Sequence, residues 1–322
     1  MQELTIGVDI GGTNAEFGIV TPEGDILCDS RIKTKDFPTP ESFVDAGVEC
    51  IHTMLADNRD KFTLANIKGM GVGAPNGNYH TGCIEYAPNL PWEGNVPLSQ
   101  MFSEKLGIPV ALTNDANAAT IGEKIYGVTK EMNDFIMITL GTGVGSGIVA
   151  NGNLIYGHDG MAGELGHMIM VRDENGRKCG CGRRGCLETY CSATGVAMTA
   201  REMLQNTNIQ SELRNKSPKD IEALDVSVAA SRGDKLALDV FQFTGEMLGK
   251  ACADFATFSN PEAFIFFGGL ARAGDLLMKH IEESFNKNAM PIFRHKAKFM
   301  ISGLMNRNAG ILGASAVVKA EF

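Results

Sequence analysis

Short apolar runs and glycine-rich turns alternate along the chain, and two segments repeat the same order of runs and turns. In the first segment, three apolar runs and the two turns between them cover 4–10, 11–14, 15–20, 22–25 and the stretch from 26 onward. In the second, the same five parts cover 135–140, 141–145, 146–150, 151–153 and 154–156. Each segment is predicted to form three strands joined by tight turns. The recurrence of this hairpin unit predicts two related domains.

The rest of the chain alternates between strand and helix patterns. Apolar runs predict strands at 67–73, 110–113 and 263–267. Helical spacing predicts helices at 41–57, from about 115 to 126 and at 309–319, and a largely helical region over 194–258. This order indicates an α/β protein in which helices return the chain between parallel strands. No low-complexity linker is present, so we expect a boundary near 115–120 to be a hinge.

Length and charge narrow the class of protein. A chain of 322 residues is long enough for two domains that each bury a core. Its 44% hydrophobic and 21% charged residues are typical of soluble globular proteins. The net charge of −9 disfavours nucleic acid or an anionic membrane as the main partner. No apolar run approaches the roughly 18 residues of a membrane span, and no secretory signal precedes Leu4, so we expect a cytoplasmic protein.

A cluster of potential metal ligands lies in the middle of the chain. Cys179, Cys181 and Cys186 follow His167 closely, and three thiolates with one imidazole are typical of a closed, structural zinc site. Free thiols or disulfides are the alternative, but 8 cysteines are too few for a disulfide framework. A cytosolic chain also keeps its thiols reduced. Glu164 and Glu188 flank the ligands, so a metal would fix both carboxylates; otherwise they are solvated charges.

The two glycine-rich turns are candidates for binding phosphate. No Gly-Lys-Ser/Thr follows them, and each leads into a strand, which excludes a Walker loop and disfavours a dinucleotide-binding fingerprint. Exposed N–H groups and threonine hydroxyls in such turns can bind anions. Two of them could hold a polyphosphate, although ordinary tight turns would have the same sequence.

Two aspartates stand at predicted strand ends. Asp115 follows a strand and opens a helix, where α/β folds bind ligands and the helix N-terminus stabilises a negative charge. We therefore interpret Asp115 as a general base; the alternative is that Asp115 or Asn114 caps the helix. Asp9 lies in an apolar strand directly before the first glycine turn. A carboxylate there is costly unless it faces a positive partner such as phosphate-bound Mg²⁺.

Taken together, these motifs resemble those of the ROK family (repressors, open reading frames and sugar kinases), and within it those of zinc-containing glucokinases. The matching segments are Asp9-Ile-Gly-Gly-Thr-Asn14, Asn114-Asp-Ala-Asn117, Leu140-Gly-Thr-Gly-Val-Gly145, Glu164-Leu-Gly-His167 and the cysteine segment ending in Glu188. Gly268-Gly269 matches the turn on the adenosine side. The motifs run in family order through the whole chain.

The resemblance implies an actin-like ATPase fold, with two ribonuclease-H-like domains around a central cleft. We expect a smaller domain of 1–117 with the C-terminal helix 305–322, and a larger domain of 118–304 that contains the zinc loop. The implied reaction transfers the γ-phosphoryl group of ATP to the 6-hydroxyl of glucose, with Asp115 as catalytic base. The implied cofactors are ATP with Mg²⁺ and a structural Zn²⁺, and we expect a homodimer.

The resemblance also assigns binding roles. Those that it implies for the sugar fall on Asn89, Asn114, Asp115, Glu164, His167 and Glu188. Those for the nucleotide fall on Asp9, Gly11, Gly12, Thr13, Asn14, Gly141, Thr142, Gly143, Gly145, Gly268 and Gly269. Zinc would be bound by His167, Cys179, Cys181 and Cys186.

Substrate choice stays open between two kinds of sugar. Asn76 occupies a position where many relatives have glycine, in a loop that approaches the sugar in the family. An N-acetylhexosamine kinase, acting on N-acetylglucosamine or N-acetylmannosamine, is therefore the alternative to a glucokinase. A sugar-responsive repressor is a remote alternative, because family repressors carry an N-terminal helix-turn-helix, whereas this acidic chain begins its first strand at Leu4.

Overall fold

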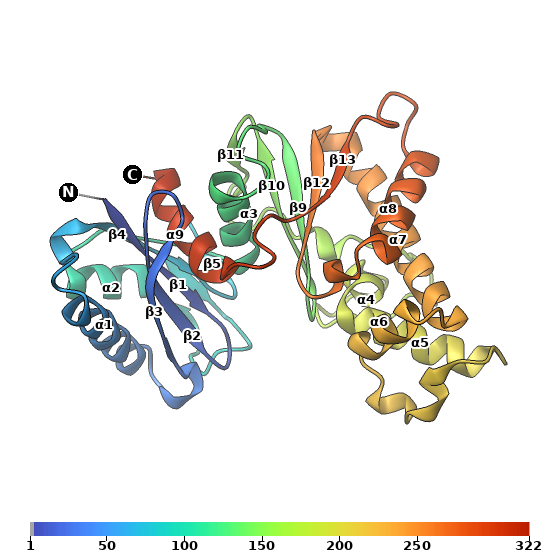
Figure 1. Cartoon of the computed structure of the whole chain (residues 1–322), viewed down its shortest axis with the longest axis horizontal. Helices are drawn as coiled ribbons and strands as arrows, with labels where there is room; N and C mark the ends of the chain where they lie inside the picture. The colour runs from blue at the N-terminus through green and yellow to red at the C-terminus, as the bar shows by residue number, and fades with distance from the viewer. Residues whose placement is uncertain (1–2, 322) are drawn as a thin grey trace. The chain divides into compact units, whose positions relative to one another are not determined.

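The computed structural model describes residues 3–321, whose contacts divide the chain into two compact units (Figure 1). Unit 1 contains the chain up to Glu131, residues 154–162 and the chain from Gly303 on. Unit 2 contains residues 132–153 and 163–302. In the part of the chain that is described, no helix combines the length and apolar character that crossing a membrane requires.

A five-stranded sheet forms the centre of unit 1, in the order β3-β2-β1-β4-β8. Its strands are β1 (Leu4–Ile10), β2 (Ala15–Val20), β3 (Ile26–Ile32), β4 (Ile67–Gly73) and β8 (Val110–Thr113). The first three strands form the predicted antiparallel hairpins, and β4 and β8 are added in parallel. The carboxyl ends of β1, β4 and β8 therefore meet at one edge of the sheet.

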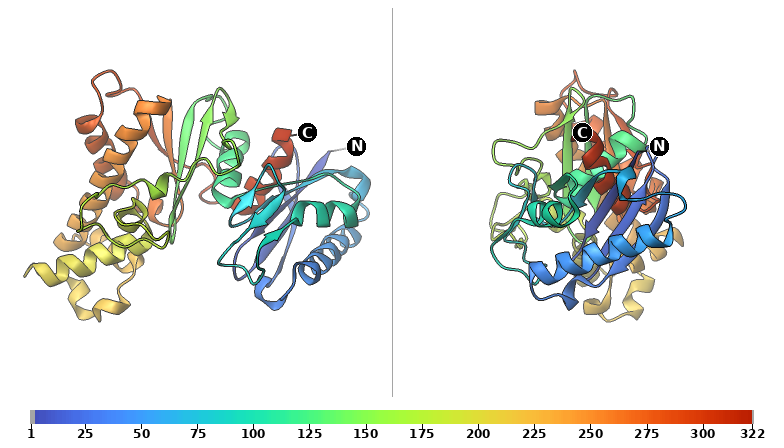
Figure 2. Two further views of the ribbon diagram at one scale, coloured as in Figure 1. Left: turned by 180° about the vertical axis from the view of Figure 1, so that it is seen from behind. Right: turned by 90° about the vertical axis from the view of Figure 1, so that its left-hand side faces the viewer.

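Helices cover both faces of this sheet. They are α1 (Pro40–Asp57), α2 (Leu98–Leu106), α3 (Asp115–Tyr126) and α9 (Ala309–Glu321). Neighbouring residues of β2 point to opposite faces, and Phe17 contacts α1 while Gly18 contacts Ile311 of α9. Figure 2 shows α1 and α9 on opposite sides of the sheet accordingly. A small sheet of β5 (Gly77–Asn78), β6 (Cys83–Glu85) and β7 (Asn95–Val96) completes unit 1.

The second sheet has the equivalent order, β11-β10-β9-β12-β13. Its strands are β9 (Phe135–Leu140), β10 (Val144–Ala150), β11 (Asn153–Leu154), β12 (Ala263–Phe267) and β13 (Lys298–Ile301). Again an antiparallel hairpin is followed by two strands added in parallel. The prediction of two related α/β units is confirmed.

The helices of unit 2 come between β11 and β13. They are α4 (Glu188–Cys191), α5 (Ala193–Asn206), α6 (Ala223–Ser231), α7 (Lys235–Ser259) and α8 (Asp275–Asn288). Helices α7 and α8, orange in Figure 1, run side by side. Glycine allows this close approach, because a Cβ atom at Gly249 would lie 2.4 Å from the carbonyl oxygen of Ile281. Short 3-10 helices occur at Thr34–Asp36, Leu64–Asn66, Leu165–His167, Glu212–Asn215, Pro218–Asp220 and Leu270–Ala273.

Some boundaries differ from the predicted ones. Strand β10 begins at Val144, two residues earlier than expected, because Val144 and Gly145 pair with β9. Strand β11 ends at Leu154, whereas we expected a strand over 154–156. The expected domain boundary after residue 117 falls inside α3, which the structure groups with unit 1. Helix α3 packs against α9, and Gly122 lies close to Gly313 of that helix.

Candidate functional site

The first glycine turn joins β1 to β2. The N–H group of Gly11 donates to the carbonyl of Asn14 over 2.9 Å and closes the turn. The N–H groups of Gly12 and Thr13 donate to no acceptor among residues 3–321, which leaves them available to an anion. A Cβ atom at Gly12 would lie 2.6 Å from the carbonyl oxygen of Asn89. The structure thus brings Asn89 beside this turn.

Two predicted aspartates come together at the edge of the first sheet. Asp9 ends β1, and Asp115 follows β8. The Cβ position of Gly73, between them on β4, lies 3.9 Å from Asp9 Oδ1 and 4.0 Å from the Cα atom of Asp115. Burial, Asp115 and then Glu16 raise the pKa of Asp9 from 3.8 to about 6. The raised pKa indicates a carboxylate whose charge is not balanced, as a site for a cation requires.

Glu16 is a site residue that sequence reasoning missed. It lies opposite Asp9 in the β1–β2 pairing, and its carboxylate accepts bonds from Arg31 at 2.5 Å and from Asn308 at 2.8 Å. The sequence could have identified Glu16, because the predicted hairpin of strands 4–10 and 15–20 places positions 9 and 16 side by side. Asn308 also caps α9, whose first turn lies against Asp9: a Cβ atom at Gly310 would be 2.2 Å from Asp9 Oδ2.

The structure separates the capping role from the proposed base. Asn114 is the N-cap of α3, and its Oδ1 accepts from the N–H of Asn117 at 2.7 Å. Asp115 is the first helical residue, and its Oδ1 accepts from the N–H of Ala116 at 2.9 Å. The cap is therefore supplied by Asn114, and Asp115 is not needed for it.

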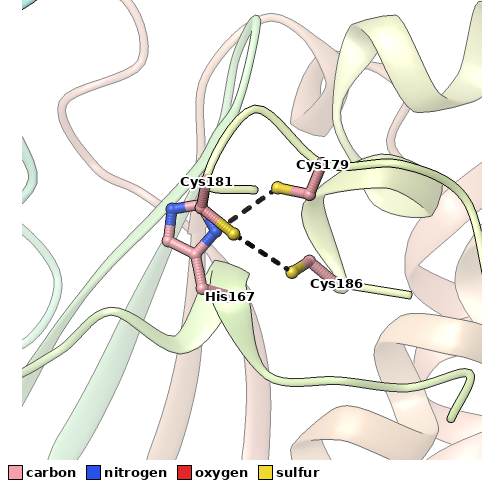
Figure 3. A group of neighbouring side chains, drawn as sticks. All are labelled: His167, Cys179, Cys181 and Cys186. Carbon is pink, nitrogen blue, oxygen red and sulfur yellow. Dashed lines mark hydrogen bonds between the residues drawn. The ribbon is translucent and has the colours of Figure 1, made fainter. Parts of the chain in front are cut away.

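The predicted metal ligands converge in unit 2 (Figure 3). The ligand atoms of His167, Cys179, Cys181 and Cys186 all lie within 4.8 Å of one another. Cys179 Sγ is 3.6 Å from His167 Nδ1, and Cys181 Sγ is 3.7 Å from Cys186 Sγ. A zinc tetrahedron with ordinary bond lengths has S···N and S···S edges of about 3.6 and 3.8 Å. The donor set and its spacing fit a structural Zn²⁺.

Two arginines, Arg183 and Arg177, stabilise the loop that carries the cysteines. Hydrogen bonds from the Arg183 backbone and guanidinium lower the pKa of Cys181 to about 6, whereas burial raises the pKa of Cys179 and of Cys186, so without a cation the cluster favours a single thiolate. Arg177 was missed by sequence reasoning. Its side chain is only 8% exposed, and it donates to the carbonyl of Thr189 at 2.8 Å and to Glu202. It fixes the loop to α4 and α5.

Both predicted carboxylates lie beside the metal cluster. Glu164 Oε2 is 3.8 Å from His167 Nε2, the ring nitrogen that faces away from the thiols. Glu188 Oε1 is 3.7 Å from Cys179 Sγ. Carboxylates near metal ligands in this way orient the ligands and are oriented by them.

The second glycine turn joins β9 to β10 and matches the first. The N–H of Gly141 donates to the carbonyl of Gly143 at 3.1 Å, while the N–H groups of Thr142 and Gly143 have no acceptor in the described chain. Gly268, with a φ of +103°, approaches the carbonyl oxygen of Leu140, which directly precedes the turn. Gly269 follows Gly268, and Gly145 lies in β10. The predicted nucleotide residues of unit 2 are therefore neighbours.

Asn76 has a backbone role. Its φ is +52°, a conformation that glycine and asparagine adopt most readily, and its Nδ2 donates to the carbonyls of Glu85 and Tyr86. Asn76 therefore holds the backbone of the β6 strand just before the segment that leads to Asn89.

Comparisons with known proteins agree with this arrangement. The sequence model of the ROK family matches residues 5–321. The glucokinase of Halalkalibacterium halodurans is 38% identical over 98% of this chain and 95% of its own length. The structure of a ROK family glucokinase from Streptomyces griseus, in complex with glucose and AMPPNP, is 35% identical with a TM-score of 0.78, over 98% of this chain and 99% of that one. The xylose repressor of Bacillus spizizenii is 29% identical over 99% of this chain and 77% of its length.

Proposed function

Because the chain belongs to the ROK family and has its actin-like ATPase fold, we propose that it is an ATP-dependent glucokinase that phosphorylates the 6-hydroxyl of glucose. The observation that carries this proposal is the juxtaposition of Asp115 and Asp9 at the edge of the first sheet, in a chain similar throughout to glucokinases. The runner-up, an acetylated hexosamine as acceptor, is an outcome of the test below.

Asp115 is the base in this proposal. Its carboxylate accepts the proton of the 6-hydroxyl as the oxygen bonds to the γ-phosphorus, and the bond from phosphorus to the β-phosphate oxygen breaks to release ADP. Phosphoryl transfer depends mostly on positioning and charge stabilisation, so one well-placed carboxylate suffices for the proton. Asn114 supplies the helix cap and Asp115 Oδ1 accepts the N–H of Ala116, so Oδ2 of Asp115 has no donor in the described residues and lies at the positive end of α3.

The two glycine turns hold phosphate in this proposal. The N–H groups of Gly12, Thr13, Thr142 and Gly143 lack protein acceptors in the described residues and suit phosphate oxygens. Nucleotide contacts extend to Gly11, Asn14, Gly141, Gly145, Gly268 and Gly269. Asp9 would hold Mg²⁺ bound with ATP, which neutralises phosphate charge when present.

Sugar recognition falls to polar side chains of both units. Glu164 and Glu188, beside the metal cluster, would accept hydrogen bonds from sugar hydroxyls, and the Nε2 group of His167 would donate one. Asn89 and the Nδ2 group of Asn114 supply donors from unit 1. Bonds to hydroxyl groups discriminate strongly, because an analogue that lacks one leaves a polar group of the site unpaired.

We also propose that the enzyme works as a homodimer in the cytoplasm and supplies phosphorylated glucose to carbohydrate breakdown. We assign the interface to Phe258, Met290 and Ile292 of unit 2, each of which is more than half exposed, at 59%, 51% and 58%. Light scattering coupled to gel filtration would test the dimer, and a monomer at micromolar concentration would contradict it.

A sugar panel tests the activity. Wild-type protein would be incubated with Mg-ATP and glucose, N-acetylglucosamine, N-acetylmannosamine or 6-deoxyglucose, and ADP release coupled to NADH oxidation. We expect rapid turnover of glucose, and binding without phosphorylation of 6-deoxyglucose. Faster turnover of an acetylated sugar than of glucose would move the assignment to an N-acetylhexosamine kinase. A phosphate on the anomeric oxygen, or no ADP with any sugar, would overturn the proposed reaction.

A further inference from the structure

We propose that Gly143 and the backbone N–H of Val144 position Glu188, so that the second glycine turn belongs to the sugar site as well as to the nucleotide site. The inference rests on the proposed function for its kinetic readout, but its structural claim is independent of the substrate. It makes Gly143 a positioning residue for the sugar and not solely a residue that admits phosphate.

The contact that carries the inference lies within unit 2. Glu188 is the first residue of α4, half-buried, two positions after the metal ligand Cys186. Its Oε2 accepts the N–H of Val144 at 3.1 Å, and Val144 is the first residue of β10, directly after the turn. The carboxylate thus joins the metal loop to the glycine turn.

Gly143 is glycine for a steric reason that the structure makes specific. Its φ is not positive, so the backbone conformation alone does not require glycine at this position. A Cβ atom at this position would lie 2.3 Å from Glu188 Oε2 and 3.3 Å from its Cδ. Ordinary contacts of such atoms are about 3.5 Å, so alanine would displace the carboxylate by about 1 Å. The group displaced is the end of a flexible side chain, which can move without unfolding the protein.

Metal binding would remove the other hydrogen-bond donor to the Glu188 carboxylate. As a free thiol, Cys179 is a second hydrogen-bond donor to Glu188, through Sγ and Oε1 at 3.7 Å. A cysteine that ligates zinc has lost this proton. In the metal-bound protein, the N–H of Val144 is then the hydrogen-bond donor that remains to Glu188 among the contacts of the described residues.

The second glycine turn is also bonded to the start of α5, the helix that follows α4. The N–H of Ala193 donates to the carbonyl of Gly141 at 2.8 Å, and the hydroxyl of Thr194 donates to that of Thr142 at 3.1 Å. Both donors open α5, which follows α4 after one residue. Glu188 and the turn therefore form one connected group, and a change in the turn is transmitted to the carboxylate.

The experiment compares Gly143→Ala with Gly141→Ala in the zinc-loaded enzyme. Gly141 is the matched position, because a Cβ atom there meets no atom within 4 Å. For Gly143→Ala we expect the KM for glucose to rise about 10-fold or more, the size typical of a lost contact that orients a site. Any effect of Gly141→Ala should fall on the KM for ATP. The inference is wrong if Gly143→Ala changes only the KM for ATP, or if both variants raise the KM for glucose equally.

A double-mutant cycle with Glu188→Ala tests whether the effect passes through Glu188. In that background, Gly143→Ala should leave the KM for glucose unchanged, because the clashing group is gone; additive effects would contradict the inference. If Gly143→Ala alone folds poorly, Glu188→Ala should restore its folding. A crystal structure of Gly143→Ala that retains the bond from Val144 N to Glu188 would overturn the inference whatever the substrate. Failure of the wild-type enzyme to phosphorylate glucose would instead contradict the proposed function.

Discussion

The glycine turns of the two units are bounded by different kinds of neighbour. In unit 1, a Cβ atom at Gly12 would meet the carbonyl oxygen of Asn89, which is backbone; in unit 2, one at Gly143 would meet the side chain of Glu188. Both turns close by an N–H of their first glycine and leave later N–H groups without acceptors in the described residues. The same hairpin therefore requires glycine for two reasons, and the consequences of substitution differ.

The carboxylates of the two units also have different electrostatic surroundings. Asp9 of unit 1 lies near Asp115 and Glu16 and is ionised at a cost, as its raised pKa shows. Glu164 and Glu188 of unit 2 lie beside groups that would bind a cation. In the proposed function, unit 1 supplies the base and unit 2 supplies carboxylates that orient the sugar. Four predictions test this comparison.

The largest effect is expected from Asp115→Asn. If unit 1 supplies the base, turnover should fall about 10²-fold or more while the KM for glucose changes little. The measurement is steady-state ADP release at saturating ATP. Asp275→Asn is the matched control, because Asp275 is also the first residue of a helix, α8, and is exposed. Near-normal turnover of Asp115→Asn would return this residue to a purely structural role.

The loss of a metal ligand should lower the affinity for glucose more than it lowers turnover. Cys181 is the exposed ligand, so Cys181→Ser removes a bond to the metal with little change in packing. We expect wild-type protein to contain about one zinc per chain and the variant much less. Glucose affinity should fall about 10-fold. Elemental analysis and glucose titration measure the two effects, and Cys83→Ser, in unit 1, is the control. Zinc-free wild-type protein with normal glucose affinity would refute the metal's role.

Asp9→Asn tests the cost of charge in unit 1. Because the native pKa is raised from 3.8 to about 6, the folded state binds the proton more tightly than the unfolded state. Ionised Asp9 therefore lowers stability as pH rises from about 4 to 6, and the full cost remains above 6. At pH 7.5 the variant should be more stable by up to about 3 kcal/mol, and at pH 4 the difference should fall below about 1 kcal/mol. Urea unfolding at both pH values measures this, and a variant that is less stable at pH 7.5 would contradict an unbalanced charge at Asp9.

The smallest effect compares the stabilities of Gly12→Ala and Gly143→Ala. The first variant must move backbone at Asn89, and we expect a loss of about 1–2 kcal/mol in the free energy of unfolding. The second needs only a side-chain rotation, and we expect a loss below about 0.5 kcal/mol. Urea unfolding of both variants at pH 7.5 gives the ranking. Equal losses would remove the distinction between the two turns.

The sequence predicted what depends on local pattern. Alternation and turn residues identified both hairpins, and the ends of parallel strands predicted where Asp9 and Asp115 lie. It did not predict that residues 154–162 belong to unit 1, where Asn78 donates to the carbonyl of Asp159 and Tyr79 stacks on Tyr156 at 4.1 Å. Nor did it identify Arg177. These contacts join residues far apart in sequence, and periodicity carries no signal for which distant segments will meet.

The placement of α9 has a consequence for the order in which the protein can mature during synthesis. This helix lies against β1 and β4. Cβ atoms at Gly7 and Gly71 would overlap the carbonyl oxygens of Ile311 and Ala314, so the close approach requires glycine at both positions. The strands β1 to β8 leave the ribosome before unit 2, but the helix that covers one face of their sheet leaves after it. All of unit 2 emerges in between, and domains generally fold as units while the chain is synthesised. Unit 2 can therefore reach its native packing while the first sheet still exposes the apolar face that α9 will cover.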